Sequence, residues 1–143
     1  MAGPSSFVPS PVTPSKIKRR FSVEEANRSL PLVSRIVRDI VASHRQITSL
    51  QGKSGAATAP KKNPPNKELD AAVDRLQTFV DELTSIGVEL KDYQAGLVDF
   101  VGRHQGRDVY LCWKLGETAI THWHELHTGF AGRQPISQLN EKE

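Results

Sequence analysis

Two long segments of the chain carry apolar residues at the spacing of an amphipathic α-helix, and this pattern constrains the fold more than any other feature. The first begins near Ser22, and its apolar residues are Leu30, Val33, Ile36, Val37, Ile40, Val41, Ile47 and Leu50. The second begins at Asn66, which can cap it, and its apolar residues are Leu69, Ala72, Val73, Leu76, Phe79, Val80, Leu83 and Ile86. Two such helices joined by a loop predict an antiparallel helical hairpin.

The ends of these helices carry recognisable sequence signals. Ser22 and Glu25 can form a capping box, in which each side chain bonds to the backbone amide of the other residue. Pro31 lacks the amide that an α-helix needs, so we expect a kink or a break there. Gly87 can adopt the left-handed conformation that often ends a helix. The sequence therefore predicts two helices with defined beginnings and ends.

The C-terminal third has the composition of a small β-sheet. The segments "VELKD", "GLVDFV" and "DVYLCWKL" are rich in strand-forming residues, and the turn residues of Gly102–Arg107 join the last two into a hairpin. In the last strand, alternation places four apolar residues on the face toward the helices: Val109, Leu111, Trp113 and Leu115. Glu117–His127 is then predicted as a short helix that ends at Gly129. We therefore predict an α+β fold: a long antiparallel helical hairpin packed on a small antiparallel β-sheet of two or three strands, plus a short C-terminal helix.

The chain is long enough for one compact domain. It has 143 residues, of which 37% are hydrophobic. Residues 1–20 are rich in proline, serine and basic side chains and are predicted to be a disordered tail. Residues 21–136 are predicted to form a single domain with a flexible loop at 52–66, and residues 137–143 a second disordered tail.

Composition also bears on the compartment and the partners. No apolar run reaches the roughly 18 to 20 residues that a membrane helix needs, and the N-terminus lacks the pattern of a secretory signal, so we expect a cytoplasmic protein with no membrane partner. Cys112 is the single cysteine, which excludes an intrachain disulfide. The net charge is +3, but the basic residues gather in segments such as 16–20 without interleaved aromatics, which argues against nucleic-acid binding.

Several short motifs follow one another in a distinctive order along the chain: "FSVEEAN", "LP" at Leu30, "GLVDF", "VYLCWKLGE", "WHE" and "GFAGRQPI". In these motifs the chain resembles the bacterial domain of unknown function 2203 (DUF2203) family, from about Phe21 to Ile136. The resemblance implies membership of a group without a known activity. The polar residues that match the family pattern are Asp99, Glu117, His124 and Arg133, and these are the candidate ligand-binding residues.

Three of the five histidines lie within "HWHELH". On a helix, His124 and His127 could ligate one ion together with Asp99 or Glu117, while His122 would point to solvent. On a strand, His122 and His124 would share a face and His127 would be excluded. The nitrogen and oxygen donors of this set suit a divalent metal such as zinc, manganese or iron.

The same residues also allow a purely structural interpretation. Glu117 could cap the start of the short helix, and His124 could bond to Asp99 in a buried polar network. Asp99 stands in the apolar segment "LVDFV", where a carboxylate is costly to bury without a partner. Arg133, Arg103 and His124 are the candidate partners.

Two classes of function follow from these observations. The first is a domain that binds a metal ion or a small ligand, with enzymatic activity left open. The second is an interaction module in which the long helices pair with another chain, for instance as a homodimer. Cys112 could act as a nucleophile if a histidine lay within hydrogen-bonding reach, although a lone strand cysteine is usually inert packing. The site hypothesis requires that Asp99 and His124 lie within about 8 Å of each other.

Overall fold

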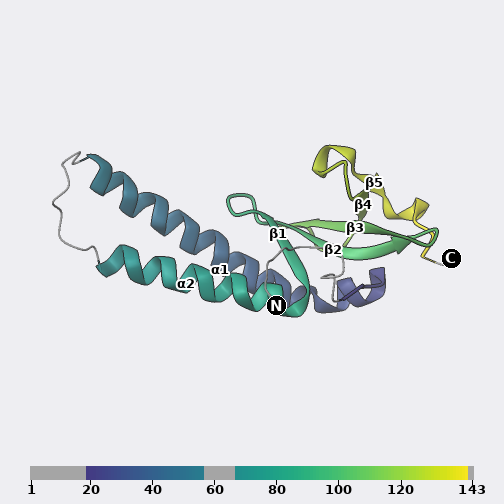
Figure 1. Ribbon diagram of the computed structural model, residues 1–143, viewed down its shortest axis with the longest axis horizontal. Coiled ribbons are helices and arrows are strands. Elements are labelled where there is room, and N and C mark those ends of the chain that lie inside the picture. The colour runs from purple at the N-terminus through teal and green to yellow at the C-terminus, as the bar shows by residue number, and fades with distance from the viewer. Residues whose placement is uncertain (1–18, 57–66, 142–143) are drawn as a thin grey trace, which may run out of the picture.

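The computed structural model describes residues 19–56 and 67–141. Two antiparallel helices are followed by five strands and two 3-10 turns, with the bounds α1 (Val23–Ala56), α2 (Lys67–Ile86), β1 (Val88–Asp92), β2 (Leu97–His104), β3 (Arg107–Lys114), β4 (His122–Glu125), η3 (Phe130–Gly132), β5 (Gln134–Pro135) and η4 (Ile136–Gln138). The strands form one antiparallel sheet in the order β1-β2-β3-β4-β5. The sheet covers one end of the hairpin, and the other end projects beyond it (Figure 1). The predicted α+β class and helical hairpin are confirmed.

Helix α1 begins with the predicted capping box. The amide of Glu25 donates to Ser22 Oγ at 3.0 Å, and the amide of Ser22 donates to Glu25 Oε1 at 2.9 Å. A kink or a break was predicted at Pro31, and the break does not occur: the helix is continuous from Val23 to Ala56. Pro31 is exposed, so the missing amide weakens the helix on the side that water reaches.

The two halves of the hairpin are packed differently. The half beneath the sheet belongs to the main core, whereas the projecting half holds a separate small cluster of Ile47, Leu50 and Ala72. Helix α2 ends at Ile86, and Gly87 has φ +101°, a conformation that turns the chain into β1 at little cost for glycine. Neither helix, over the residues described, is long and apolar enough to cross a membrane.

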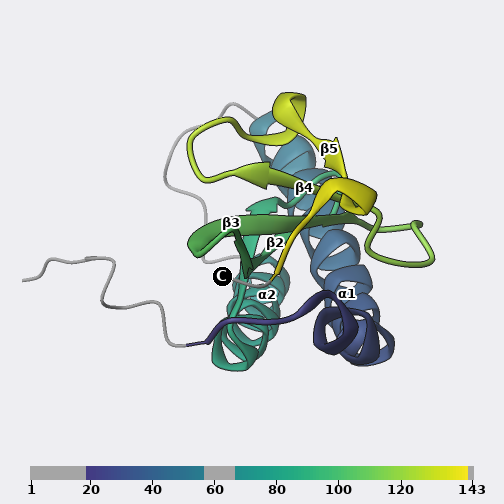
Figure 2. The ribbon, with the colours of Figure 1, turned by 90° about the vertical axis from the view of Figure 1, so that its right-hand side faces the viewer.

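The sheet lies across the helices (Figure 2), with an apolar face toward them and a polar face on the other side. The apolar face contributes its buried residues to the main core: Val88, Val98, Phe100, Val109, Leu111, Trp113 and Trp123. The four residues predicted to face the helices do so: Val109, Leu111 and Trp113 lie in this core, and Leu115 packs against it. Gly102 leaves room for Leu111, because a Cβ at Gly102 would lie 2.9 Å from the Leu111 side chain. The strand alternation of β3 was therefore predicted correctly.

The predicted short helix at 117–127 is wrong. These residues form a loop followed by β4, only 3-10 turns occur further on, and the sheet has five strands instead of two or three. The amide of Ile120 donates to Asn27 Oδ1 of α1 at 2.7 Å, which holds the loop in a non-helical path. Pairing with β3 then buries Trp123 on the apolar face and His124 on the polar face. Tertiary burial decides the conformation here over the local pattern.

The predicted C-terminal tail is part of the domain as far as residue 141. Leu139 packs against the main core, and a carboxylate oxygen of Glu141 accepts a 2.7 Å hydrogen bond from the amide of Val23 at the start of α1. At the other end, Arg20 of the predicted N-terminal tail forms an ion pair with a carboxylate of β3.

Only the first part of the flexible loop predicted at 52–66 lies in the described chain, and there the prediction is wrong. Residues 52–56 continue helix α1, and residues 57–66 lie outside the described part of the chain. The predictions of disorder for residues 1–18 and 142–143 also fall outside it.

Candidate functional site

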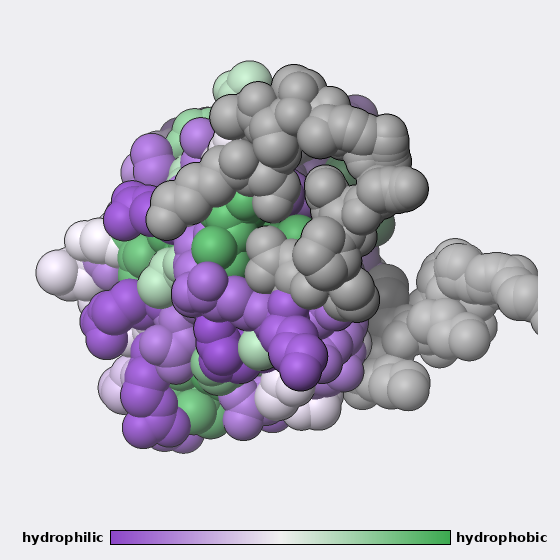
Figure 3. Space-filling view, turned by 90° about the vertical axis from the view of Figure 1, so that its left-hand side faces the viewer, coloured by the Kyte–Doolittle hydropathy of each residue, from purple (hydrophilic) through white to green (hydrophobic). Residues whose placement is uncertain are grey.

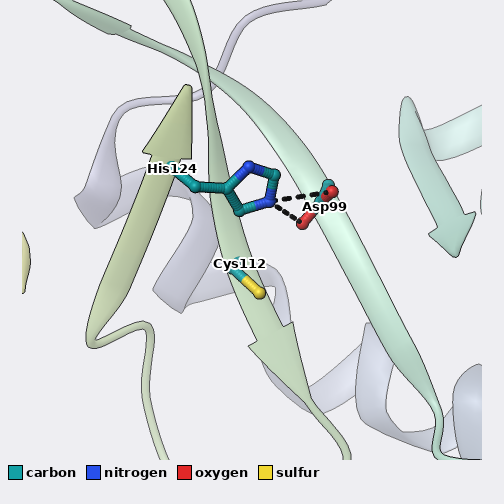
Figure 4. A group of neighbouring side chains, drawn as sticks. All are labelled: Asp99, Cys112 and His124. Carbon is teal, nitrogen blue, oxygen red and sulfur yellow. Dashed lines mark hydrogen bonds and ion pairs between the residues drawn. The ribbon is translucent and has the colours of Figure 1, made fainter. Parts of the chain in front are cut away.

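Three adjacent strands bring an aspartate, a cysteine and a histidine together on the polar face of the sheet. Asp99 of β2 lies directly opposite Cys112 of β3. His124 of β4 lies opposite Tyr110, which is the neighbour of Cys112 on the same face of β3. The side chains of Asp99, Cys112 and His124 converge between the strands (Figure 4). One carboxylate oxygen, the thiol sulfur and one imidazole nitrogen all lie within 4.8 Å of one another. All three residues are buried, with at most 3% exposure.

The imidazole of His124 is held in a defined orientation. Its Nδ1 lies 2.8 Å from the backbone carbonyl oxygen of Glu125, which can only accept, so we assign the proton to Nδ1. In the neutral ring the lone pair is then on Nε2, which lies 3.3 Å from both carboxylate oxygens of Asp99. Two acceptors that face each other need a proton or a cation between them. Ion-paired hydrogen bonds of this type are usually nearer 2.7–2.9 Å.

The ionisation of the cluster is strongly affected by its burial. Burial raises the pKa of Asp99, although the nearby His124 and Lys91 oppose this shift. Burial, reinforced by the charge of Asp99, raises the pKa of Cys112 to about 12. The thiol is therefore protonated at neutral pH and is a poor nucleophile as it stands. A bound cation would favour the ionised forms of both groups.

A second polar group lies beside the cluster toward the edge of the sheet. Arg133 donates through Nη2 to Glu117 Oε2 at 2.9 Å and to His122 Nδ1 at 3.2 Å. His122 is the direct cross-strand neighbour of Cys112, so this group adjoins the thiol. The charge of Arg133 lowers the pKa of Cys112 and that of Glu117 raises it, both less than burial does.

On the opposite flank, β1 contributes Glu89 and Lys91. The Tyr110 hydroxyl donates to Glu89 Oε1 at 2.9 Å, and Lys91 pairs with the same oxygen at 3.0 Å. The Lys91 ammonium also lies 4.5 Å from the centre of the Tyr110 ring, which in turn is 5.4 Å from the imidazole of His124. The buried cluster is thus bordered by one ion-paired group on each side.

The structure unites most of the residues predicted for the site. Asp99 and His124 are in contact, and Glu117 and Arg133 pair with each other next to them. His127 is exposed and lines a surface hollow away from the cluster, together with the Arg107 and Glu125 ion pair. The strand alternative, which excluded His127, therefore describes its position, and the helical alternative is wrong. Glu117 caps no helix, because none forms there.

Cys112 was expected from the sequence as a possible nucleophile and not as a member of this cluster. The signal was present in the strand alternation, which put Cys112 on the face opposite the helices. The hairpin turn between β2 and β3 fixes the register that places Asp99 directly across from Cys112. The same reasoning could not place His124 beside them, because the residues of β4 were predicted to form a helix.

The fold and the site define a small α+β domain whose sheet carries a buried Asp, Cys and His cluster on the face away from its helical hairpin. The family model described as "Uncharacterized conserved protein (DUF2203)" matches residues 19–136, and the chain belongs to this family. No curated protein and no solved structure matches the chain.

Proposed function

We propose that this domain binds one divalent transition-metal ion, preferably zinc, between Asp99, Cys112 and His124. The observation that carries the proposal is that Nε2 of His124 faces both carboxylate oxygens of Asp99 at 3.3 Å, with a thiol in the same buried group. The 2.8 Å bond from His124 Nδ1 to a backbone carbonyl is the outer contact that metal-ligating histidines commonly make. It orients the ring and directs the Nε2 lone pair at the proposed ion.

The size of the group supports a tetrahedral ion. Zinc bonds to nitrogen and oxygen at about 2.0–2.1 Å and to sulfur at about 2.3 Å, so the N and O ligands of a tetrahedral site are about 3.3 Å apart and S and O about 3.5 Å. The distance between His124 Nε2 and the Asp99 oxygens is already 3.3 Å. Small side-chain rotations would complete the site.

The donor set argues against manganese, one of the metals considered from the sequence. A thiolate is a soft ligand that selects zinc or iron, whereas manganese prefers oxygen donors. Three protein ligands leave the fourth position for water or a bound molecule, which is the arrangement of zinc sites that interact with a substrate. The ion would there act as a Lewis acid, and the proposal names no reaction.

The test is a metal titration of the purified full-length chain with zinc and with cobalt(II). We expect one ion per chain, and for cobalt a thiolate charge-transfer band in the near ultraviolet. His124→Ala and Cys112→Ser should each weaken binding at least tenfold, about 1.4 kcal/mol or more. His127→Ala is the matched control, because His127 is exposed and lies outside the cluster, and it should bind metal like the unchanged protein.

Circular dichroism of each variant separates loss of metal from loss of fold. Metal-free protein after a titration to saturation, or equal binding by the folded His124→Ala and His127→Ala variants, would refute the proposal. The Asp99 and His124 contact would then be a structural hydrogen bond.

Self-assembly through the long helices is the second candidate. It is favoured by helix α2, in which only Ala72 and Leu83 are buried, while Val73 is 46% exposed. Apolar surface interspersed with hydrophilic side chains is visible on the end of the molecule where the hairpin projects (Figure 3). Sedimentation equilibrium of the full chain, compared with Val73→Lys, tests this candidate. A monomer at all concentrations would exclude it, and a dimer that Val73→Lys dissociates would support it.

A further inference from the structure

Arg133 carries a buried donor that no hydrogen bond accounts for. Its Nη2 bonds to Glu117 and His122, whereas its Nε is shielded from water and has no hydrogen-bond partner among the described residues. An unpaired buried donor is costly, about 1–3 kcal/mol, and is uncommon in folded proteins. Its presence beside a candidate metal site therefore calls for a functional explanation.

The Nε and Nη2 groups of an arginine form one edge of its guanidinium, and two other arginines near the sheet use this edge fully. Arg20 and Arg107 each donate from both Nε and Nη2 to the two oxygens of one carboxylate. Arg133 donates to Glu117 through Nη2 alone. The second oxygen of Glu117 instead accepts from the backbone amide of Lys114 at 3.0 Å. Half of the Arg133 edge is thus left for another oxygen acceptor.

The position of this edge is fixed next to the cluster. Arg133 bonds to His122, the cross-strand neighbour of Cys112, and its guanidinium carbon lies 4.5 Å from the centre of the Phe130 ring. Stacking on an aromatic ring holds a guanidinium plane in one orientation. The side chain is only 16% exposed, so its charge acts on the buried cluster more than on solvent.

The geometry points to an oxyanion subsite at Arg133, where a small carboxylate or phosphate accepts a hydrogen bond from Nε beside the ion held by Asp99, Cys112 and His124. This inference rests on the proposed function and extends it by naming the class of ligand. An ionised Asp99 and a Cys112 thiolate would neutralise a divalent ion, and Glu117 balances the charge of Arg133, so the unpaired Nε–H is the group that attracts an oxyanion. A single ligand oxygen is enough for this contact, because Nη2 of Arg133 is already bonded to Glu117 and His122.

The edge of the sheet provides a route to Nε. Arg133 lies between η3 and β5, and β5 pairs with β4 at only two positions. Phe130, which stacks on the guanidinium, is itself 42% exposed. A ligand therefore reaches Nε by displacement of the partly exposed Phe130 side chain, without opening the core.

The test is a titration of the full chain with inorganic phosphate and, separately, with acetate, followed through the arginine Nε–H signals in proton–nitrogen NMR spectra. Arg133→Lys identifies the Arg133 signal, and sodium chloride at equal ionic strength controls for screening. We expect the Arg133 signal to shift and saturate, and the Arg107 signal to stay in place because its edge is already paired. One equivalent of zinc should lower the concentration needed for half of the shift at least about tenfold.

The two oxyanions distinguish the source of the ligand. A response to phosphate alone indicates phosphorylated ligands, and a response to acetate alone indicates carboxylates. An Arg133 signal that stays fixed, or that moves with chloride as much as with either oxyanion, overturns the subsite even if zinc binds. Failure of zinc to bind overturns the proposed function, whereas a saturating shift in the metal-free chain would still support the subsite.

Discussion

The lone pair of one imidazole nitrogen decides how the cluster behaves. With the proton of His124 held at Nδ1 by a backbone carbonyl, Nε2 and the Asp99 carboxylate can coexist only with a proton or a cation between them. Cys112 keeps its own proton, because burial raises the pKa of the thiol to about 12. Metal binding at this site would therefore be linked to proton release.

The apparent zinc affinity should rise with pH. Zinc must displace the Cys112 proton, because the pKa of the thiol is about 12, so affinity increases at least about tenfold per pH unit from about pH 6 to about pH 9. The slope steepens at the acidic end, where Asp99, whose pKa is raised by burial, must also lose a proton. Competition with a chelator of known affinity measures this dependence. Cys112→Ser should bind more weakly and keep only the part of the slope that comes from Asp99, and a pH-independent affinity in the unchanged protein would argue against thiolate ligation.

Asp99→Asn should separate metal binding from stability. Burial raises the pKa of Asp99, so ionisation of the folded protein costs free energy, and this cost is present above the folded pKa and absent below the ordinary one. The asparagine amide can donate to His124 Nε2 without a charge. At neutral pH the metal-free free energy of unfolding should stay the same or rise by about 1 kcal/mol, while zinc affinity falls at least about tenfold. Urea denaturation and metal titration give the two values, and a loss of more than about 2 kcal/mol would show that the charged pair stabilises the fold.

At the scale of the elements, the sequence predicted what local periodicity determines. The helical stripes, the capping box and the alternation of β3 depend on residues close in the chain, and the structure contains all three. The stretch at 117–127 has short apolar spacings that fit a helix or a strand. Its conformation is decided by distant partners, among them the side chain of Asn27 and the edge of β3.

The candidate site was only partly predicted for the same reason, because it depends on contacts between segments that are distant in the sequence. Asp99 and His124 were singled out as isolated polar residues and proved to be in contact. The role of Cys112 depended on the pairing of three strands, which local spacing does not reveal. His127 was paired with His124 because a helix was assumed, whereas β4 ends at Glu125 and His127 lies in the turn that follows it.

Asn27 joins helix α1 to the loop that leads into β4, and its loss should weaken this connection. Asn27→Ala removes the acceptor for the buried amide of Ile120 and should lower the free energy of unfolding by about 1–3 kcal/mol. Asn27→Asp keeps an acceptor oxygen at the same position and should retain most of the stability. Chemical denaturation of the three proteins measures the difference. Equal stability of the alanine and aspartate variants would mean that the loop is held by other contacts.

For the whole molecule, the proposed ion would tie together the three central strands of the sheet. Zinc that binds the folded chain alone should stabilise it, by about 2.7 kcal/mol when free zinc is about 100 times its dissociation constant. Thermal unfolding with zinc and with excess chelator measures this gain. It should vanish in His124→Ala and persist in His127→Ala. An increase of similar size in both variants would place the bound zinc elsewhere on the protein.

The hydrogen bond between Glu141 and Val23 brings the two ends of the described chain to the same corner of the domain. A short linker between residues 141 and 19 could therefore close the chain into a ring, and the ring could be reopened between α1 and α2. Such a circular permutant would begin with α2, end with α1 and keep every strand of the sheet in its order. If it folds and binds zinc like the original protein, the order in which the chain is made is not required for the architecture or for the site.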